Sequence, residues 1–198
     1  GDEKGAAVVR AGAGPISLGE LARGGMRVDA SITEPPLSAS AAARAQVESE
    51  RMLREHQVKA QSNKKFQDMQ RVRERLPAFQ MRDEILAAVR SSQVVVISGD
   101  TGCGKTTQLP QLVLDEAIAS SAGGRVEMIC TQPRRISAMA VADRVAAERG
   151  ETVGQTVGYQ IRLEAKRSRD TRLLFCTTGV LLRRLQGDCL LQGVTHIF

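Results

Sequence analysis

The pattern of apolar and polar residues changes at Leu76-Pro77. Before this point apolar residues are sparse, whereas beyond it short β-branched runs alternate with amphipathic stretches. Proline disfavours helical backbone in the residue before it, so this dipeptide also marks a boundary between elements. Strands that alternate with helices indicate an α/β domain over 76–198, in which helices cover both faces of a parallel sheet.

The expected elements follow from this alternation. Met81, Ile85 and Val89 recur every four residues and predict an amphipathic helix near 78–90. The run Val94–Ile97 is short and β-branched, which is typical of a buried parallel strand. Further strands are expected near 126–131, 173–177 and 195–198, and further helices near 105–119, 136–149 and 179–185.

Two segments precede this domain. Residues 1–39 are rich in Gly, Ala, Ser and Pro and lack an apolar period, which predicts a flexible arm. Residues 40–75 predict an N-terminal helical extension, a charged linker capped by Ser38 or Ser40. Its apolar positions form only a weak stripe: Val47, Met52, Val58, Phe66 and Met69. We favour a solvated linker helix, and the alternative is a basic arm that contacts RNA.

Charge and composition limit the partners. Lys+Arg 28 against Asp+Glu 22 gives a net charge of +6, which permits a polyanionic partner without identifying one. Aromatic residues make up 3% and Trp is absent, so a surface that stacks many bases on aromatic rings is not expected. If nucleic acid binds, we expect most contacts to go to its phosphate backbone. No apolar run approaches the roughly 20 residues that span a bilayer, so no membrane partner is expected.

The four cysteines lie far apart and include no C-x-x-C pair. A structural zinc site or a disulfide framework is therefore not expected. Cys130 and Cys176 lie in apolar runs, where a buried cysteine behaves as a small hydrophobic residue. This usage predicts a reducing compartment, the cytosol or the nucleus.

The string Gly99–Thr106 matches G-x-x-x-x-G-K-[ST], with an apolar strand before it and a helix after it. Glycines allow consecutive backbone amides to turn around a phosphate, and the helix points its positive end at the same anion. Lys105 can then reach the β- and γ-phosphates of a nucleotide, while the Thr106 hydroxyl can ligate Mg²⁺. The candidate nucleotide residues within the string are Gly99, Thr101, Gly102, Cys103, Gly104, Lys105 and Thr106.

The phosphate loop does not say how the energy of the nucleotide is used, because kinases, GTPases, transporters and helicases share it. A second string, Thr131–Ala138, follows a strand and opens a helix. Its adjacent Arg134 and Arg135 could hold a phosphodiester at a helix N-terminus. Taken alone, this string favours two solvated loop arginines.

Together the strings resemble the DEAH-box RNA helicases of superfamily 2. The similar segments are L-P-A-F-Q-M-R-D-E-I-L at 76–86, G-D-T-G-C-G-K-T-T-Q at 99–108, T-Q-P-R-R-I-S-A at 131–138, G-Y-Q-I-R-L-E at 158–164 and C-T-T-G-V-L-L-R-R-L at 176–185. They correspond in order to the entry of the first RecA-like domain, motif I, motif Ia, the approach to an RNA-contacting hook turn, and motif Ib. The T-T-G form of motif Ib and the long basic helix before the domain are more similar to the G-quadruplex-resolving and maleless-type branch of the family.

The resemblance implies a RecA-like P-loop NTPase domain that uses ATP and Mg²⁺, with other NTPs as alternatives. Thr107 would hydrogen-bond near the phosphates. Arg144 would stack on the base, and its alternative role is that of a surface helix arginine. The residues implied to face RNA are Arg134, Arg135, Arg162, Thr178 and Gly179. Structured DNA remains open as a second nucleic-acid partner.

In this family an acidic D-E-A-H box follows a strand like T-H-I-F, and the chain ends at Phe198. We therefore expect a truncated domain that lacks the carboxylates for hydrolysis and does not turn over ATP at a helicase rate. A turnover near about 1 s⁻¹ from these residues alone would contradict this expectation. The competing interpretations are a nucleotide-switched RNA-binding scaffold without hydrolysis and a small-molecule kinase.

Overall fold

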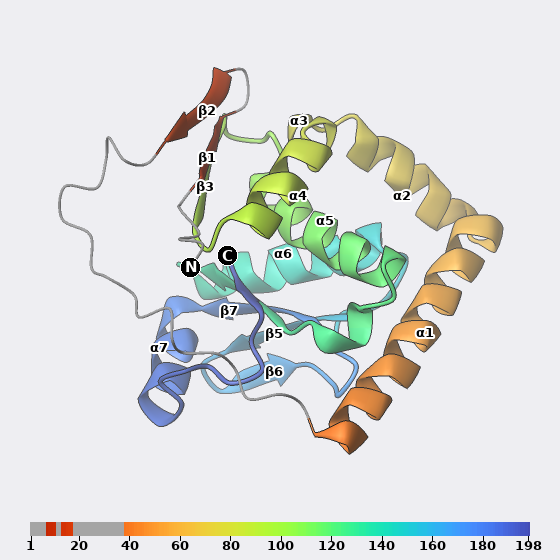
Figure 1. Cartoon of the computed structure of the whole chain (residues 1–198), viewed down its shortest axis with the longest axis vertical. Coiled ribbons are helices and arrows are strands. Elements are labelled where there is room, and N and C mark those ends of the chain that lie inside the picture. Colours follow the sequence, from red (N-terminus) through yellow and green to blue (C-terminus); the bar gives the residue numbers. More distant parts are fainter. Residues whose placement is uncertain (1–6, 11–12, 18–37) are drawn as a thin grey trace.

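The computed structural model describes residues 7–10, 13–17 and 38–198. Most of these residues form one layer of strands with helices packed around it (Figure 1). The five-stranded sheet has the order β6-β5-β7-β4-β8. Its strands are β4 (Met128–Gln132), β5 (Val157–Ile161), β6 (Glu164–Lys166), β7 (Leu173–Thr177) and β8 (His196–Ile197). Only β6, at one edge, runs antiparallel to its neighbour.

The centre of this sheet is apolar on both faces. In β7 the residues Leu173 to Cys176 are all buried, as are Met128 to Cys130 in β4. Continuous apolar runs are typical of parallel strands that helices cover on both sides. Cys130 and Cys176 are 3% and 1% exposed, so the prediction that both are buried is confirmed.

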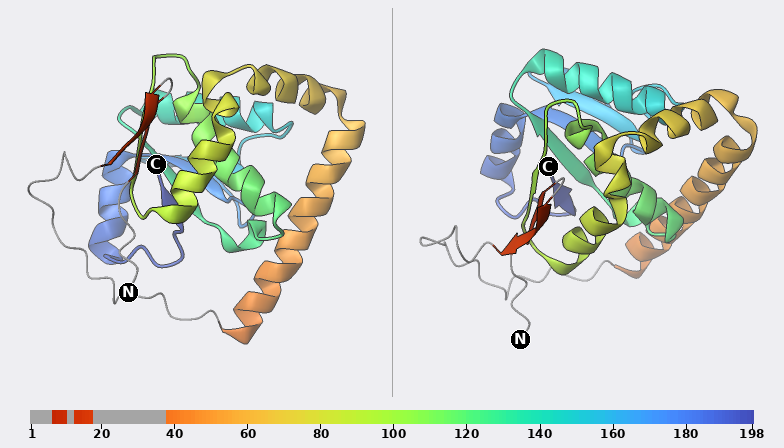
Figure 2. Two further views of the ribbon diagram at one scale, coloured as in Figure 1. Left: turned by 45° about the horizontal axis from the view of Figure 1, so that its top comes forward. Right: turned by 90° about the horizontal axis from the view of Figure 1, so that it is seen from above.

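Helices α6 (Arg135–Glu148) and α7 (Thr178–Gly187) connect parallel strands across neighbours. The connection from β4 through α6 moves toward β5, whereas the connection from β7 through α7 moves toward β8. Right-handed crossovers in opposite directions place their helices on opposite faces of the sheet (Figure 2). The predicted α/β class, a mainly parallel sheet flanked by helices, is therefore confirmed.

The strand before the phosphate loop differs from its prediction. Strand β3 (Val95–Ser98) pairs with β1 (Ala7–Arg10) in a separate three-stranded sheet that also contains β2 (Ala13–Ser17). Val94 and Val96 are 57% and 46% exposed, so the expectation of a fully buried strand is wrong. Burial alternates along β3, and only its Val95 and Ile97 pack against the core.

The predicted flexible arm over 1–39 contains β1 and β2, which the sequence did not predict. The rest of that arm lies outside the described residues, except for Ser38, which caps the following helix, and Ala39, which begins it.

The helical extension is two helices where the sequence predicted one. Helix α1 (Ala39–Ser62) ends at Asn63, whose backbone is extended with φ −100° and ψ 98°. The Asn63 side chain then accepts a hydrogen bond of 3.0 Å from the amide of Phe66 and so caps α2 (Lys64–Glu74). Asparagine is favoured at such N-caps because its side chain replaces the missing backbone acceptor.

A second predicted helix is also divided. The segment expected over 78–90 forms α3 (Pro77–Gln80) and α4 (Arg82–Ser91), with Met81 between them outside the helical conformation. The predicted helix at 105–119 is present as α5 (Lys105–Ala119). Within the described ranges, no helix combines the length and the apolar character needed to cross a bilayer.

The extension packs against the domain. Met52 and Phe66 are 6% and 3% exposed, whereas Val47 and Val58 on other sides of α1 are 65% and 60% exposed. A helix that is solvated all round is therefore not what forms here. Instead, α1 runs across the outside of the domain and contacts the short 3-10 helix Gly123–Arg125.

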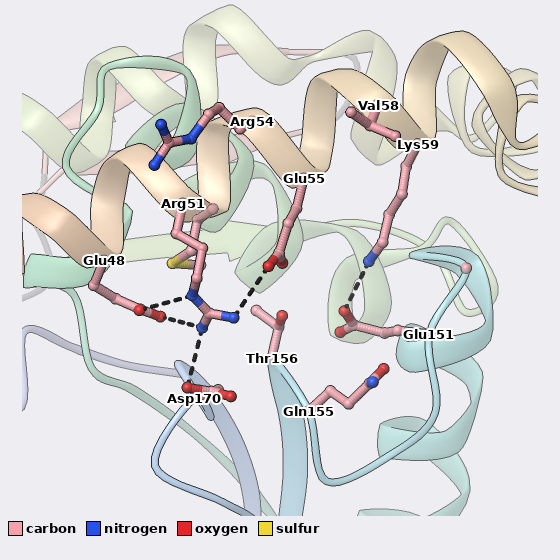
Figure 3. Close-up of a pocket in the computed structure, with 12 residues that line it drawn as sticks. Glu48, Arg51, Arg54, Glu55, Val58, Lys59, Glu151, Gln155, Thr156 and Asp170 are labelled. Carbon is pink, nitrogen blue, oxygen red and sulfur yellow. Dashed lines mark hydrogen bonds and ion pairs between the residues drawn. The ribbon is translucent and has the colours of Figure 1, made fainter.

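Ion pairs add to this contact. Arg51 on α1 lies 2.7 Å from Glu48, 3.1 Å from Glu55 and 3.0 Å from Asp170, which belongs to the connection between β6 and β7 (Figure 3). Lys59 lies 3.3 Å from Glu151. These side chains line a pocket of about 560 Å³ between α1 and the sheet, away from the phosphate loop.

Helix α1 approaches the domain closely at Gly124. Its amide donates a hydrogen bond of 2.9 Å to the buried Ser49 hydroxyl. A Cβ at this position would collide with the carbonyl oxygen of Ala45 and lie 2.9 Å from the amide nitrogen of Ser49. We expect Gly124→Ala to lower the free energy of unfolding by about 2 kcal/mol, because backbone must move to accommodate it. Thermal unfolding followed by circular dichroism would measure this change.

Gly187→Ala provides the control for this substitution. Gly187 is the last residue of α7, and a Cβ there would meet nothing within 4 Å. We expect this variant to unfold at or above the wild-type temperature, because alanine favours helical backbone over glycine. Equal transition temperatures for the wild type and Gly124→Ala would show that α1 is not packed against Gly124.

Candidate functional site

The phosphate loop joins the carboxyl end of β3 to the start of α5. Gly102 and Gly104 have φ angles of 86° and 95°, in the left-handed region that side chains disfavour. A Cβ on Gly104 would lie 3.1 Å from Cγ of Gln108 and 3.3 Å from Cδ1 of Leu76. Gly104 is therefore required both for its conformation and for the close packing around it.

The start of α5 has the features of an anion site. The helix begins at Lys105 directly after Gly104, and no side chain caps its first amides. Such amides carry the positive end of the helix dipole and remain available to a phosphate. Lys105 Nζ donates to the carbonyl oxygens of Gly99 and Asp100, at 2.6 and 2.8 Å. The ammonium group is thus held at the loop, where a phosphate would meet it.

The other loop residues divide by exposure. Thr101 and Thr106 are exposed, whereas Cys103 is buried with its sulfur 3.5 Å from Lys105 Nζ. The Thr107 hydroxyl donates a 3.2 Å hydrogen bond to the carbonyl oxygen of Gly104. Exposed Thr106 is therefore the loop hydroxyl that could ligate Mg²⁺. The described residues contain no cluster of three His, Cys, Asp or Glu that could hold a metal ion.

A triphosphate with Mg²⁺ fits these residues. There is open space beside Gly102, the uncapped amides and Lys105 supply positive charge, and Thr106 supplies an oxygen. When bound, Mg²⁺ would neutralise charge between the phosphates and hold them in register.

Arg144 lies on α6, near the end that packs beside α5. Its side chain is 54% exposed, and its Nε donates to Glu148 Oε1 at 2.7 Å. One edge of the guanidinium is therefore fixed by a buried carboxylate while the rest of it stays accessible. This arrangement leaves a flat cationic face for a stacking partner.

The five residues implied to face RNA lie at the carboxyl ends of parallel strands, along one side of the sheet. Arg134 and Arg135 follow β4, Arg162 follows β5, and Thr178 and Gly179 follow β7; all five are exposed. Since these three strands are parallel neighbours, their carboxyl ends meet at the same edge. Loops and helix N-termini at this edge are where open α/β sheets bind their ligands.

One contact joins two of these segments directly. Arg135 Nη2 donates to the carbonyl oxygen of Arg162, at 3.4 Å. Leu163, next along the turn between β5 and β6, has a φ of 68° and is 96% exposed. The turn therefore presents Arg162 beside Arg135 on the surface.

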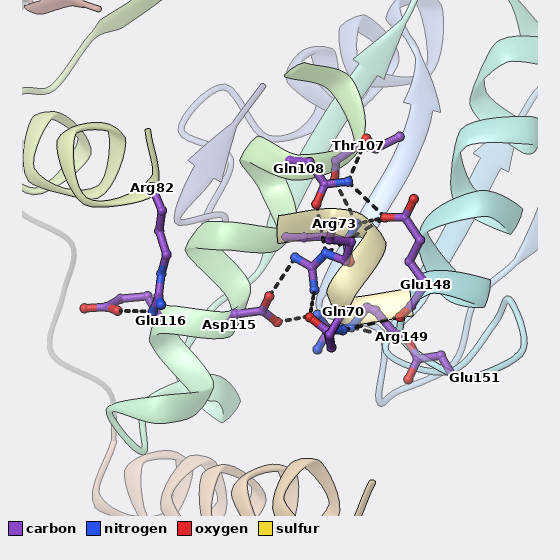
Figure 4. A network of polar contacts seen from close by, with 11 residues as sticks. Gln70, Arg73, Arg82, Thr107, Gln108, Asp115, Glu116, Glu148, Arg149 and Glu151 are labelled. Atoms are coloured by element: carbon purple, nitrogen blue, oxygen red, sulfur yellow. Dashed lines mark hydrogen bonds and ion pairs between the residues drawn. The ribbon is translucent and has the colours of Figure 1, made fainter. Parts of the chain in front are cut away.

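A buried polar network next to the phosphate loop was missed by the sequence reasoning (Figure 4). Its members are Gln70, Arg73, Gln108, Gln111, Asp115, Glu148 and Arg149. Burial raises the pKa of Asp115, but the nearby charges of Arg149 and Arg73 outweigh it and lower that pKa below its ordinary value. The available signal was the pair Gln108 and Gln111, polar residues next to the apolar residues Leu109, Leu112, Val113 and Leu114 of α5.

The chain is similar to several proteins that are named as DExH-box or DHX-type helicases. Over 145 residues it is 58% identical to the DExH-box ATP-dependent RNA helicase DExH1 of Arabidopsis thaliana, which covers 73% of this chain and 15% of that protein. Over 131 residues it is 60% identical to the DExH-box ATP-dependent RNA helicase DExH3 of the same plant, covering 66% of this chain and 11% of the relative.

A third relative is the ATP-dependent DNA/RNA helicase DHX36 of Rattus norvegicus. It is 47% identical over 142 residues, which cover 70% of this chain and 14% of that protein. No family model matches the chain. The chain thus spans between 11% and 15% of the length of these three relatives.

Proposed function

We propose that this chain forms the nucleotide-binding part of an NTP-dependent RNA helicase, because it belongs to the DExH/DEAH-box helicase family. The observation that carries this proposal is the phosphate loop, which has every residue of its motif on a strand-to-helix turn with left-handed glycines. ATP is the proposed nucleotide, and other NTPs are alternatives.

Binding proceeds through the residues of the loop. Lys105 exchanges the carbonyls of Gly99 and Asp100 for the β- and γ-phosphates, which are stronger partners for an ammonium group. The first amides of α5 bind the phosphates, and Thr106 binds Mg²⁺. Gly102 keeps the backbone open for this approach, and Gly104 adopts the left-handed conformation from which α5 starts.

Arg144 is the proposed contact to the base. Its flat face, fixed by Glu148, would stack on a base without hydrogen bonds to the base edge. Such stacking tolerates ATP, GTP, CTP and UTP alike. The alternative role, a surface arginine that only pairs with Glu148, predicts no effect of Arg144 on nucleotide affinity.

Hydrolysis and unwinding are proposed for a longer protein of this family. In this chain Asp100 lies within the loop, and Asp115 is engaged by Arg73 and Arg149. We propose that these 198 residues bind nucleotide and RNA without a helicase-rate turnover. A nucleotide-switched RNA-binding scaffold would behave in the same way, and both would act in the cytosol or the nucleus.

Lys105→Ala tests nucleotide binding. We expect the Kd for a fluorescent ADP with Mg²⁺ to rise at least about tenfold, because the charge-assisted bonds to the phosphates are lost. Fluorescence titration of the 198-residue chain would measure it. Lys59→Ala is the matched control, because this lysine pairs with Glu151 away from the loop. Equal affinities of Lys105→Ala and the wild type would overturn the proposed function.

Arg134→Ala/Arg135→Ala tests RNA binding at the sheet edge. We expect weaker binding of single-stranded RNA, and a plot of log K against log salt that is shallower by about 0.7 per lost phosphate contact. Fluorescence anisotropy between low and moderate salt would give both quantities.

Lys64→Ala/Lys65→Ala is the control for this experiment. It also removes two adjacent exposed charges at the start of a helix, but on the extension. We expect it to leave the salt slope unchanged. A shallower slope in this control variant alone would instead assign RNA binding to the basic extension.

A further inference from the structure

Arg73, near the end of α2, is an arginine buried inside the protein. Its side chain is 1% exposed, and all three of its nitrogens are engaged. Nε donates to Gln108 at 2.8 Å, Nη1 to Gln70 at 2.8 Å and Nη2 to Asp115 at 2.9 Å (Figure 4). A buried guanidinium is stable only when its donors are satisfied in this way, so its partners are held in fixed positions.

The bond to Gln108 fixes the orientation of an amide next to the phosphate loop. Because Gln108 Oε1 accepts from Arg73, its Nε2 must donate, and it does so to the Thr107 hydroxyl at 2.9 Å and to Glu148 at 3.0 Å. The Thr107 hydroxyl then directs its own proton to the carbonyl of Gly104, at 3.2 Å. A chain of hydrogen bonds thus runs from the extension to the loop.

Two further contacts reach the loop from the residues that follow Arg73. The amide of Ala78 donates to the carbonyl of Cys103, at 3.0 Å. Leu76 packs against Gly104, where a Cβ would come within 3.3 Å of it. Segment 73–78 therefore supports the phosphate loop at three points: through Arg73 and Gln108, at Leu76 and at Ala78.

The same network extends toward the proposed base contact. Glu148 is buried and accepts from Gln108 and Gln111 on one oxygen and from Arg144 on the other. Arg73 Nε lies 4.0 Å from this carboxylate. Fixing Gln108 consequently fixes the carboxylate that orients Arg144.

We propose that Arg73 is a positioning residue through which the helical extension sets the nucleotide affinity of the phosphate loop. The proposal rests on the nucleotide binding proposed above and assigns to the extension a role beyond that of a linker. Displacing α2 would release Gln108, loosen Thr107 and Gly104, and weaken nucleotide binding. By linkage, a bound nucleotide would hold α2 more firmly on the domain.

Arg73→Met and Arg149→Met form a matched pair for testing this role. Arg149 is also buried and pairs with the same carboxylate, Asp115, at 2.6 Å, but it donates no hydrogen bond to Gln108 itself. We expect both variants to lose thermal stability. Only Arg73→Met should raise the Kd for Mg·ADP, by about tenfold, which is within the usual range of coupling between sites. Wild-type affinity of Arg73→Met, or equal losses in both variants, would overturn the proposal.

A double-mutant cycle tests whether Arg73 acts on the phosphate loop through Gln108 or only by stabilising the whole domain. Gln108→Met removes the amide that connects Arg73 to Thr107 and keeps a similar volume. If the relay exists, adding Arg73→Met to Gln108→Met should weaken Mg·ADP binding no further, whereas the losses of thermal stability continue to accumulate. Independent, multiplying effects on Kd would show that Arg73 does not act through Gln108.

A measurement on the wild type does not depend on the folding of any variant. Hydrogen exchange of the amides 64–78 should slow when Mg·ADP is added to the full chain. Unchanged exchange in a chain that binds Mg·ADP would overturn the role of Arg73 alone. If Lys105→Ala binds Mg·ADP as the wild type does, the proposed function fails, and the role of Arg73 fails with it.

Discussion

The structure depends on the charge balance of one buried network. Asp115 on α5 lies between Arg73 from the extension and Arg149 at the end of α6, at 2.9 and 2.6 Å. Removing either arginine leaves a buried charge with fewer partners, which is costly in a protein interior. Three helices from separate parts of the sequence are therefore held in register by these groups. The phosphate loop lies at the start of one of these helices, and of the two arginines only Arg73 also donates a hydrogen bond to Gln108 beside the loop.

What could be predicted from the sequence was local. The turn from strand to phosphate loop to α5 depends on glycines and a helix start within one short string, so it could be predicted from the sequence. The parallel strands β4 and β7 were readable for the same reason, because burial on both faces leaves continuous apolar runs. The structure of such segments is determined by residues that lie close together in the sequence.

The rest depended on contacts between distant residues. Arg73 lies among Arg71 and Arg75, and nothing in their order shows that only Arg73 is buried. Its role requires Gln108 and Asp115, which are brought to it by the packing of α2 on α5. The break at Asn63 was missed because asparagine also occurs within helices, and only the packing of Phe66 below the break favours the capped form. Likewise, β3 looked like a buried strand because a β-branched run does not reveal which faces will be covered.

Helix α6 connects the two proposed binding regions. Arg135 begins it at the carboxyl edge of the sheet, beside Arg162, while Arg144 and Glu148 lie near its other end, beside α5. Fourteen residues of helix span about 21 Å and behave as a rigid rod. Glu148 bonds to Gln108 and Gln111 near one end of this helix, and Arg135 lies at the other end. One helix thus contributes both to the network beside the phosphate loop and to the surface proposed to face RNA.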